Sequence, residues 1–335
     1  MIKDVEFGDV MTSDGEYIPE TKIPDGSRCE GGENKLYCDD SREILQDMDD
    51  DSVHLVVTSP PYNLDIEYGE YDDRNAVEEW KNLIRDVFEE LYRVVVPDGK
   101  VCINIGGSYE TTDDSGRYQR VPLNSHIINI ASDIGFDMYD EFVWAKNQFQ
   151  SHGGGQPLFG SYPYPTNFMA TQQHEYVLVF RNWRSESYHD KRELIDRESD
   201  CGDISELSKD RWRKITKSIW NIPAVNHSSL ETEHNAIFPS EIPKRCIELY
   251  SYAGDVVLDP FAGTGTTLHQ ANDLHRQFVG IDVDPSYINA TLRRFEFGSL
   301  NAETDAEKRA HMVKSANGTE SEMQNSGEQS GLDHF

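Results

Sequence analysis

The chain has 335 residues, which is enough for one large α/β domain with a smaller inserted region. No run of 18 or more apolar residues could span a membrane, and five scattered cysteines without a CxxC pair indicate neither a disulfide framework nor a zinc site. The formal net charge is −30, from 61 acidic and 31 basic residues, and only 13 of the basic residues are lysines.

This acidic, lysine-poor composition resembles that of proteins from salt-loving organisms, so we expect a halophilic archaeal source. Acidic tails alone do not explain it, because acids also crowd the middle of the chain, as in Asp47-Met48-Asp49-Asp50-Asp51. Charge of this kind concerns solubility and not fold. The first residues lack the basic and apolar stretches of a signal peptide, so we expect a cytoplasmic protein with no membrane partner.

The two ends of the chain lack the periodicity of packed elements. Residues 1–30 predict an extended arm, and the polar residues 301–335 predict a disordered tail. Between them, residues 31–300 alternate apolar runs of strand length with stretches of helical spacing, which predicts an α/β fold with a doubly wound, mostly parallel sheet. The expected strands are 53–57, 100–105, 136–146, 176–180, 255–258 and 277–281, and the expected helices are 78–92, 125–134 and 241–250.

The first buried strand ends in the loop Thr58-Ser59-Pro60-Pro61-Tyr62. Two prolines stiffen this loop and remove two N–H donors, so that acceptors dominate, above all the Ser59 hydroxyl and the Pro60 carbonyl. Tyr62 adds a flat ring on which a base can stack. An isolated Pro-Pro-Tyr is more often a stiff loop or a ligand for a proline-binding domain, but this one follows a strand in a chain with a second ligand-binding loop.

These groups suit methylation of an exocyclic amine. The lone pair of such an amine is delocalised into the base, so the nitrogen is a poor nucleophile. Acceptors that hydrogen-bond both amine protons free the lone pair, and a sulfonium methyl group then transfers directly, with positioning and preorganised electrostatics carrying the rate. The base must first leave the helix, and stacking on Tyr62 would hold it.

A second loop follows the strand expected at 255–258 and reads Asp259-Pro260-Phe261-Ala262-Gly263-Thr264-Gly265-Thr266. A glycine-containing turn at the carboxyl end of a strand is where doubly wound sheets bind ligands. Its two glycines let the backbone pass close to a ligand, and the start of the next helix offers amides to a carboxylate.

The ligand of this second loop is not expected to carry a phosphate. A dinucleotide fingerprint requires Gly or Ala at the position of Leu268, and a P-loop requires a lysine after the second glycine. Asp282, at the end of the next expected strand, can accept both hydroxyls of a ribose. A ribose without phosphate fits S-adenosylmethionine. The alternative is an ordinary turn with helix-capping threonines, which Asp259 and Asp282 together disfavour.

The two loops together resemble the β-class amino-methyltransferases of DNA. The catalytic motif of that family is Asp, Asn or Ser followed by Pro-Pro-Tyr or Pro-Pro-Phe, its cofactor motif is Phe-x-Gly-x-Gly, and the catalytic motif comes first, as it does here. Four further stretches match along residues 34–298, with Asn235 where the family usually has proline. They are Asp40-Ser41-Arg42-Glu43-Ile44-Leu45, the strands Phe142-Val143-Trp144-Ala145-Lys146 and Glu175 to Phe180, and His234-Asn235-Ala236-Ile237-Phe238-Pro239.

The resemblance implies a Rossmann-like methyltransferase fold for residues 31–300, with S-adenosyl-L-methionine as cofactor and no metal. It implies that Asp40 lies near the adenine end of the cofactor and that residues 234–239 wrap its methionine moiety. The implied catalytic residues are Ser59, Pro60, Pro61 and Tyr62. The implied cofactor-binding residues are Asp40, His234, Phe238, Pro239, Asp259, Phe261, Gly263, Thr264, Gly265, Thr266 and Asp282.

Ser before Pro-Pro-Tyr is typical of cytosine-N4 enzymes in this family, and Asp or Asn is typical of adenine-N6 enzymes. The expected activity is therefore site-specific methylation of cytosine N4 in double-stranded DNA after base flipping. Adenine-N6 methylation and RNA amino-methylation are the alternatives within enzymes. A non-catalytic nucleic-acid-binding protein is the alternative outside them, which the intact motifs disfavour. Carbon-5 methylation is disfavoured because the chain has no Pro-Cys. The expected state is a monomer or a homodimer, and a cognate restriction enzyme is a candidate partner.

A target-recognition region is expected at about 147–217. Within it, residues 181–217 hold ten basic and nine acidic residues, a near-neutral balance in an otherwise acidic chain. Basic side chains on one cleft would position the duplex through its phosphates. For any single arginine, a solvated surface position is the simpler interpretation. The candidate DNA-binding residues are Arg181, Arg184, Arg211, Arg213, Lys214 and Lys217.

Overall fold

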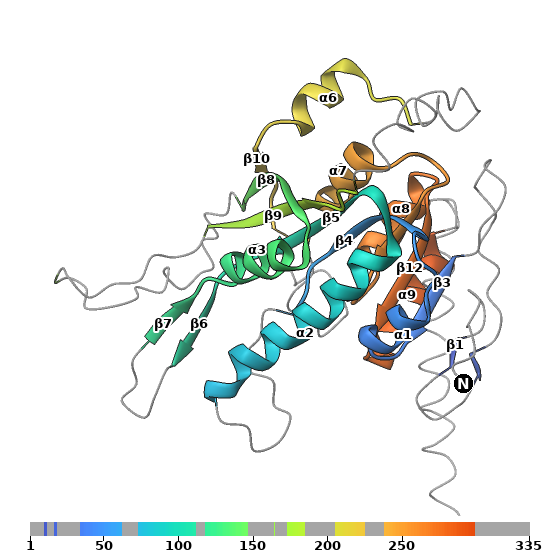
Figure 1. The fold of residues 1–335 in the computed structure, drawn as a ribbon. Coiled ribbons are helices and arrows are strands. Elements are labelled where there is room, and N and C mark those ends of the chain that lie inside the picture. Colours follow the sequence, from blue (N-terminus) through green and yellow to red (C-terminus); the bar gives the residue numbers. More distant parts are fainter. Residues whose placement is uncertain are drawn as a thin grey trace, which may run out of the picture. The chain divides into compact units, whose positions relative to one another are not determined.

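The computed structural model describes residues 10–11, 17–18, 34–61, 73–111, 118–146, 164, 173–184, 205–224 and 238–298 (Figure 1). The chain divides into two compact units, Met1–Thr291 and Leu292–Phe335. The elements discussed below belong to the first unit, except helix Pro285–Gly298, which crosses the boundary at Thr291. Of the predicted arm, the described part is an antiparallel pair, β1 (Val10–Met11) with β2 (Tyr17–Ile18), and the predicted tail lies outside the described residues.

The first unit is built on a sheet in which eight described strands follow the order β10-β8-β9-β5-β4-β11-β12-β3. All neighbouring pairs are parallel except the two that involve β9, which therefore runs against the other seven. The mostly parallel sheet is thus confirmed. The strands are β3 (Lys35–Cys38), β4 (Val53–Thr58), β5 (Val95–Ile105), β8 (Asp137–Ala145), β9 (His174–Arg181), β10 (Ile219–Asn221), β11 (Val256–Asp259) and β12 (Gln277–Asp282).

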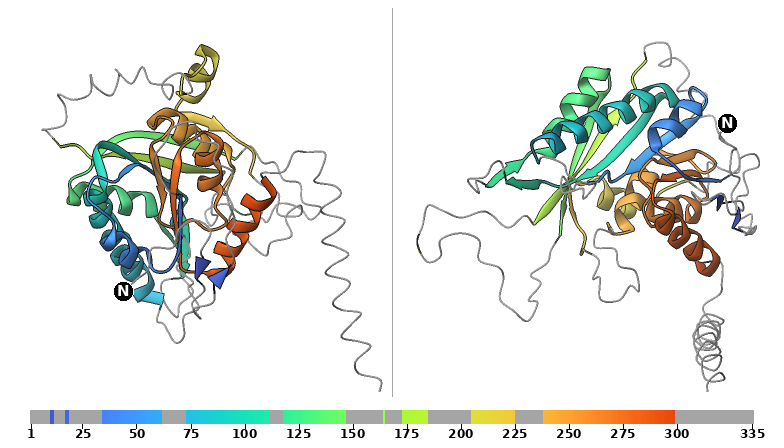
Figure 2. Two further views of the ribbon diagram at one scale, coloured as in Figure 1. Left: turned by 90° about the vertical axis from the view of Figure 1, so that its right-hand side faces the viewer. Right: turned by 90° about the horizontal axis from the view of Figure 1, so that it is seen from below.

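Helices cover both faces of this sheet (Figure 2). On one face lie α1 (Ser41–Asp47), α2 (Asp73–Val94) and α3 (Leu123–Ile134), and on the other lie α7 (Glu241–Tyr250) and α8 (Thr266–Asp273). The doubly wound architecture predicted from the alternating pattern is therefore confirmed. The remaining elements are the pair β6 (Ser108–Thr111) and β7 (Tyr118–Val121), helix α6 (Lys209–Ile215), and helix α9 (Pro285–Gly298).

The strand expected at 100–105 begins earlier, because Pro97-Asp98-Gly99, whose residue types favour a turn, forms a bulge inside β5 and not a boundary. The strand begins at Val95, opposite Val53, and pairing resumes with Lys100 opposite Leu55. Asp98 takes a positive φ of 65°, and an added Cβ at Gly99 would lie 2.8 Å from the carbonyl oxygen of Val96. The chain therefore stays in the sheet through three extra residues, which the turn-forming sequence alone did not indicate.

The core lies between the sheet and the α2–α3 layer. Phe88 of α2 contacts Phe136 and Phe180 edge-on, with ring centroids 6.0 Å apart in both pairs. Leu91 and Ile127 are fully buried beside them. Burying such side chains supplies about 1.5–3 kcal/mol each, so this layer fixes α2 and α3 on the sheet.

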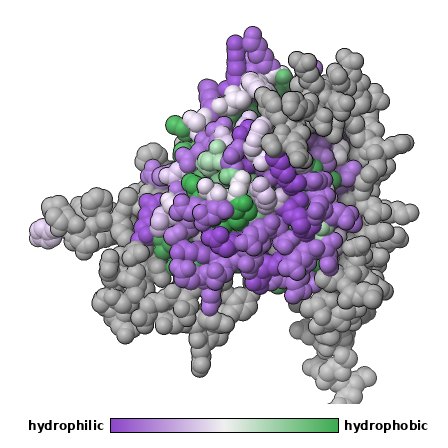
Figure 3. Space-filling model, in the orientation of Figure 1, coloured by the Kyte–Doolittle hydropathy of each residue, from purple (hydrophilic) through white to green (hydrophobic). Residues whose placement is uncertain are grey.

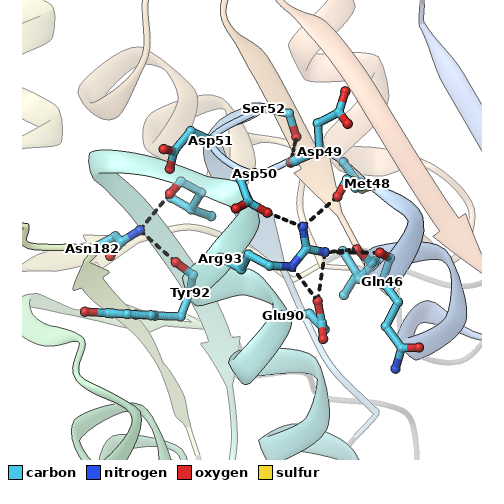
Figure 4. Close-up of polar contacts among 12 residues, drawn as sticks. Gln46, Met48, Asp49, Asp50, Asp51, Ser52, Glu90, Tyr92, Arg93 and Asn182 are labelled. Carbon is cyan, nitrogen blue, oxygen red and sulfur yellow. Dashed lines mark hydrogen bonds and ion pairs between the residues drawn. The ribbon is translucent and has the colours of Figure 1, made fainter.

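At the edge where the parallel strands begin, here the amino edge, the end of α2 is tied to the end of α1 (Figure 4). The Arg93 guanidinium donates to the carbonyl oxygens of Leu45 and Met48, at 2.6 and 2.7 Å, and pairs with Asp50 and Glu90. Arg93 thus hydrogen-bonds carbonyls at the end of α1, where helices leave such groups short of intrahelical donors; the Leu45 carbonyl also accepts the Met48 N–H at 3.2 Å.

The face shown in Figure 3 is largely hydrophilic where its residues are described. Among the described helices, none is both long enough and apolar enough to cross a membrane.

Candidate functional site

The two loops singled out from the sequence meet at the opposite edge of the sheet, the carboxyl edge. Strands β4 and β11 are parallel neighbours, with Val56 opposite Leu258. Their ends, Thr58 and Asp259, therefore emerge side by side, and the Ser59-Pro60-Pro61 turn and the glycine loop follow directly. This meeting of loops is the geometry in which doubly wound sheets bind ligands.

The first loop is held from below by a helix. The Trp80 indole N–H, on the buried face of α2, donates to the Pro61 carbonyl at 2.8 Å. Pro60 is buried, Ser59 is half-buried and Pro61 is exposed. This hydrogen bond fixes the end of the loop at Pro61 and leaves Ser59 half-buried at the carboxyl edge of the sheet. Tyr62 lies outside the described residues, so its predicted stacking role stays a prediction.

The second loop is joined to the first through its helix and its leading acid. The Thr267 hydroxyl of α8 donates to the Val57 carbonyl of β4 at 3.2 Å. Asp259 is fully buried next to Thr58 and Thr267, and one of its oxygens accepts the Phe261 N–H at 3.1 Å. Burial raises the pKa of the Asp259 carboxyl to about 6, against the lowering effect of the two threonine hydroxyls.

The glycines of this loop are required for two different reasons. Both take positive φ angles, 52° at Gly263 and 74° at Gly265. A Cβ on Gly265 would collide with the Thr291 side chain, whereas one on Gly263 would meet nothing within 4 Å. The Thr291 hydroxyl also donates to the Gly263 carbonyl at 3.1 Å. Gly265 is therefore needed for packing, and Gly263 borders open space that a ligand can fill.

Asp282 closes the loop from the end of β12. One of its carboxylate oxygens accepts the Gly263 N–H at 2.7 Å, and the other accepts the Asp284 N–H at 2.9 Å. Each carboxylate oxygen has two lone pairs and can therefore accept more than one hydrogen bond. The half-buried side chain thus positions the glycine loop and remains chemically suited to a diol.

These features fit S-adenosyl-L-methionine without a phosphate site. Gly265 is the N-cap of α8 and has no side chain with which to cap the helix, so the first N–H groups suit a carboxylate. Thr264 and Thr266 are buried in the same turn, and Phe261 is half-buried. The N–H donors at the start of α8 suit the carboxylate of this cofactor. The open space at Gly263 leaves room for a ligand, and the Asp282 carboxylate suits the hydroxyls of its ribose.

Another predicted cofactor residue, Asp40, serves the local backbone. Asp40 is the N-cap of α1, and its carboxylate accepts the Arg42 N–H and pairs with the Arg42 guanidinium at 2.6 Å, which lowers the Asp40 pKa. The adjacent Ser41 hydroxyl donates to the Pro260 carbonyl, so α1 is attached to the glycine loop. This contact places the start of α1 beside the glycine loop, and the place of Asp40 near the adenine end of the cofactor stays a prediction.

The block expected around the methionine moiety is described only at its end. Phe238 is half-buried and Pro239 is buried, and the Pro239 carbonyl accepts the Ile242 N–H at 2.9 Å at the start of α7. His234 lies outside the described residues.

The structure does not bring Arg181 and Arg184 to the Ser59 loop. Because β9 runs against its neighbours, Arg181 lies at the amino edge, where it pairs with Asp137 at 2.6 Å. Arg184 donates to the carbonyls of Tyr92 and Val95 and pairs with Asp51 at 2.9 Å. Both guanidinium groups hold the protein's own chain together, which corrects their expected place beside the DNA site.

The remaining predicted basic residues belong to α6 and the turn after it. Arg211 is not displayed for a ligand, because it pairs with Glu241 at 2.8 Å and with Glu248, both on α7. Arg213, Lys214 and Lys217 are exposed. The expected region 147–217 also includes β9, which is an interior strand of the sheet, so it is not one continuous insertion.

One polar cluster at the carboxyl edge was missed from the sequence. Asn104, at the end of β5, donates to the Glu175 carboxylate of β9 at 2.7 Å, and Lys146, just after β8, pairs with the same carboxylate at 2.5 Å. Asn104 and Glu175 are both buried. The available signal was a polar residue at each of two apolar runs, because Asn104 lies within Val101–Ile105 and Glu175 immediately precedes Tyr176–Phe180.

The comparisons with known proteins agree with this geometry. Residues 53–293 match the model of a family described as DNA methylase, which spans N6 and N4 methyltransferases. The chain is 33% identical over 280 residues to the type II methyltransferase M.MjaI of Methanocaldococcus jannaschii, covering 76% of this chain and 88% of that protein. It is 30% identical over 287 residues to M.MthZI of Methanothermobacter thermautotrophicus, covering 78% of each.

Solved structures show the same fold. TTHA0409 from Thermus thermophilus, complexed with S-adenosyl-L-methionine, is 29% identical, with a TM-score of 0.59 over 78% of this chain and 93% of that one. The cytosine-N4-specific PvuII DNA methyltransferase is 20% identical, with a TM-score of 0.58 over 82% of this chain and 90% of that one. The Rossmann-like methyltransferase fold predicted from the motifs is confirmed.

Proposed function

Because the chain belongs to the DNA methylase family, we propose that it transfers a methyl group to the exocyclic N4 of cytosine at a specific site in double-stranded DNA. The observation that carries this proposal is the juxtaposition of two loops at the ends of β4 and β11. The acceptor-rich loop suits an amine, and the glycine loop suits a sulfonium cofactor. At this position, one substrate nitrogen and one methyl group can lie between the two loops.

The cofactor is S-adenosyl-L-methionine, which supplies an electrophilic methyl carbon on a positively charged sulfur and keeps the electron pair of the broken bond on that sulfur. The residues that hold it are those of the glycine loop, with Asp282 accepting from the ribose and the first N–H groups of α8 donating to the carboxylate. The protein does not form a covalent bond to either substrate in this scheme, so rate enhancement comes from positioning and from fixed dipoles.

The Ser59 hydroxyl oxygen and the Pro60 carbonyl oxygen accept hydrogen bonds from the two N–H groups of the target amine. This draws the nitrogen toward tetrahedral geometry and frees its lone pair to form the new bond to carbon, after which the nitrogen releases one proton to solvent. The Trp80–Pro61 hydrogen bond keeps these acceptors in place, which is the preorganisation that such electrostatic catalysis needs. Tyr62 is proposed to stack on the flipped base.

Cytosine is proposed because Ser59 precedes the Pro-Pro-Tyr sequence. Adenine N6 is the second candidate, since both amines present the same two protons to this loop. The three exposed cations Arg213, Lys214 and Lys217 are proposed to contact DNA phosphates. We further propose that the protein is a monomer or a homodimer and that a restriction enzyme accompanies it. A halophilic source and a cytoplasmic location are also proposals.

Expression in a host that lacks such methylation, followed by sequencing that detects modified bases, tests the proposal. Wild-type protein should leave N4-methylcytosine in one short sequence, and Ser59→Ala should lower the single-turnover rate by about 100-fold, the usual effect of one preorganised hydrogen-bonding group. Cofactor binding by the variant, measured by calorimetry, should stay unchanged. If the product is N6-methyladenine, the target base is adenine and the proposal of cytosine is wrong. If the DNA is unmodified, the proposal of DNA methylation is wrong.

A further inference from the structure

The cluster of Asn104, Glu175 and Lys146 lies in one row with Ser59 at the carboxyl edge. Thr58 of β4 is opposite Ile103 of β5, so Ser59 and Asn104 follow at the same level on neighbouring strands. Strand β9 lies beyond β5, and β8 lies beyond β9. Polar groups from four adjacent strands are thus aligned beside the acceptor loop.

The Glu175 carboxylate is the centre of this row. It is buried and receives the Asn104 amide at 2.7 Å and the Lys146 ammonium at 2.5 Å. The Glu175 side chain is 10% exposed and the Lys146 side chain is 30% exposed, so the pair runs from the interior toward the accessible edge. The ammonium also lies over the Trp144 ring, 5.0 Å from its centroid, which limits its movement.

Fold stability does not require such a cluster at this place. Removing two charges from water costs several kcal/mol per ion, and apolar side chains of similar volume often serve a core as well or better. The neighbouring residues of β9, Val177 to Phe180, are apolar and buried. A paired charge at the catalytic edge therefore indicates recognition of a polar ligand group.

We infer that Lys146 donates a hydrogen bond to the carbonyl oxygen of the flipped target base, and that Glu175, braced by Asn104, is the positioning residue that aims it. The inference rests on the proposed function and concerns the same site. An ammonium has three donors, and Glu175 takes one of them. Cytosine has a carbonyl group at C2, whereas adenine has none. The pair selects cytosine by a feature that is independent of Ser59.

Binding to an unreactive base separates recognition from chemistry. The probes are two duplexes of the recognition sequence found by sequencing, one with 2-pyrimidinone at the target position and one with an abasic site there. 2-Pyrimidinone keeps the C2 carbonyl and lacks the amine, so it cannot be methylated. Wild-type protein with S-adenosylhomocysteine should bind the 2-pyrimidinone duplex more tightly, and Lys146→Met should reduce this preference by about tenfold or more, as expected for loss of a charge-assisted hydrogen bond.

Three further variants complete the test. Glu175→Gln should weaken the preference less than Lys146→Met, and Lys146→Arg should restore part of it, because it keeps a charged donor. Asp137→Asn is the matched control, since it neutralises the acid of an ion pair at the other end of the same strand pair, and should leave the preference unchanged.

Equal preference in wild type and Lys146→Met, or no preference in wild type, would overturn the inference while N4-methylcytosine in the product keeps the proposed function. Adenine as the methylated base would overturn both, and the sequencing shows this before any variant is made. If Lys146→Met does not fold, the binding preferences of Lys146→Arg and Glu175→Gln test the inference. If Glu175→Gln prefers the 2-pyrimidinone duplex as strongly as wild type does, Glu175 is not a positioning residue.

Discussion

The two edges of the central sheet use charged side chains in opposite ways. At the amino edge, Arg93 and Arg184 direct their guanidinium groups to backbone carbonyls at the ends of α1 and α2. At the carboxyl edge, Asp259, Asp282 and Glu175 hold loops and side chains around a place for a ligand. One edge completes the hydrogen bonding of the chain itself, and the other is where we propose that cofactor and substrate bind.

This difference between the two edges shows that a basic residue in the expected target-recognition region need not contact DNA. Arg184 and Arg213 look alike in the sequence, yet one closes a helix end and the other is exposed on α6. Arg184 lies at the amino edge because it follows β9, which runs antiparallel to the other strands of the sheet. Arg213 lies on α6 instead. The four predictions that follow test whether the edges are as different as their contacts indicate.

Gly265→Ala should have the largest effect on stability. The added Cβ collides with Thr291 and the residue must keep a positive φ, so we expect a loss of about 2–5 kcal/mol in the free energy of unfolding. Gly263→Ala is the matched control, because it has the positive φ and no collision, and should lose only about 1–2 kcal/mol. Urea denaturation measures both, and equal losses would show that Thr291 moves aside.

The Asp259 carboxyl should make the protein less stable as pH rises. Its folded-state pKa of about 6 lies above the unfolded value of about 3.9, so the folded state binds more protons between these values. The resulting stabilisation is fully present below about pH 4 and is lost as pH rises through 6, by roughly 3 kcal/mol at most. Asp259→Asn should flatten that part of the stability curve. An unchanged slope in the variant, measured by thermal unfolding across pH 4–7, would assign it to other groups.

Arg93→Met should destabilise the amino edge and leave the carboxyl edge intact. The variant loses charged hydrogen bonds to the carbonyls of Leu45 and Met48, so we expect a loss of about 2 kcal/mol in the free energy of unfolding. The affinity of the folded protein for S-adenosyl-L-methionine should not change. A cofactor affinity that falls together with stability would mean that the two edges are coupled through α1.

The smallest effect should be on the salt dependence of DNA binding. Arg213→Met should reduce the slope of log affinity against log salt by about 0.9, the value for one lost phosphate contact. Arg184→Met should leave that slope unchanged, since its guanidinium is committed to Asp51 and to two carbonyls. Similar slopes for wild type and Arg213→Met would remove α6 from the DNA interface.

Much of the fold followed from local pattern. Helix α7 begins and ends where its spacing predicted, at Glu241 and Tyr250, and the apolar run at β4 stops within one residue of the expected end. The bulge in β5 was not predicted, because its Pro-Asp-Gly sequence has the chemistry of a turn and only pairing with β4 keeps it in the sheet. The same limit applies to β9, whose direction depends on tertiary pairing.

The candidate site was predictable where one short segment carries the chemistry. The Ser59 loop and the glycine loop are continuous in sequence, so their residue types and order were enough. The Glu175 cluster joins residues 29 and 71 positions away from Glu175, at Lys146 and Asn104, and no local pattern links them. Asp282 was expected to face a ribose, but its contacts with two backbone N–H groups were not foreseen.

Because β9 runs antiparallel to β8, the chain leaves β8 and enters β9 at neighbouring points. Ala145 is opposite His174, and the Lys146 N–H donates to the Gln173 carbonyl at 3.0 Å. The free energy of closing a loop changes slowly with its length, so segments of different lengths can join these two points without shifting the sheet register. The described residues Lys146 and Gln173 are therefore a defined pair of splice points for a protein engineer who wishes to exchange the connecting segment.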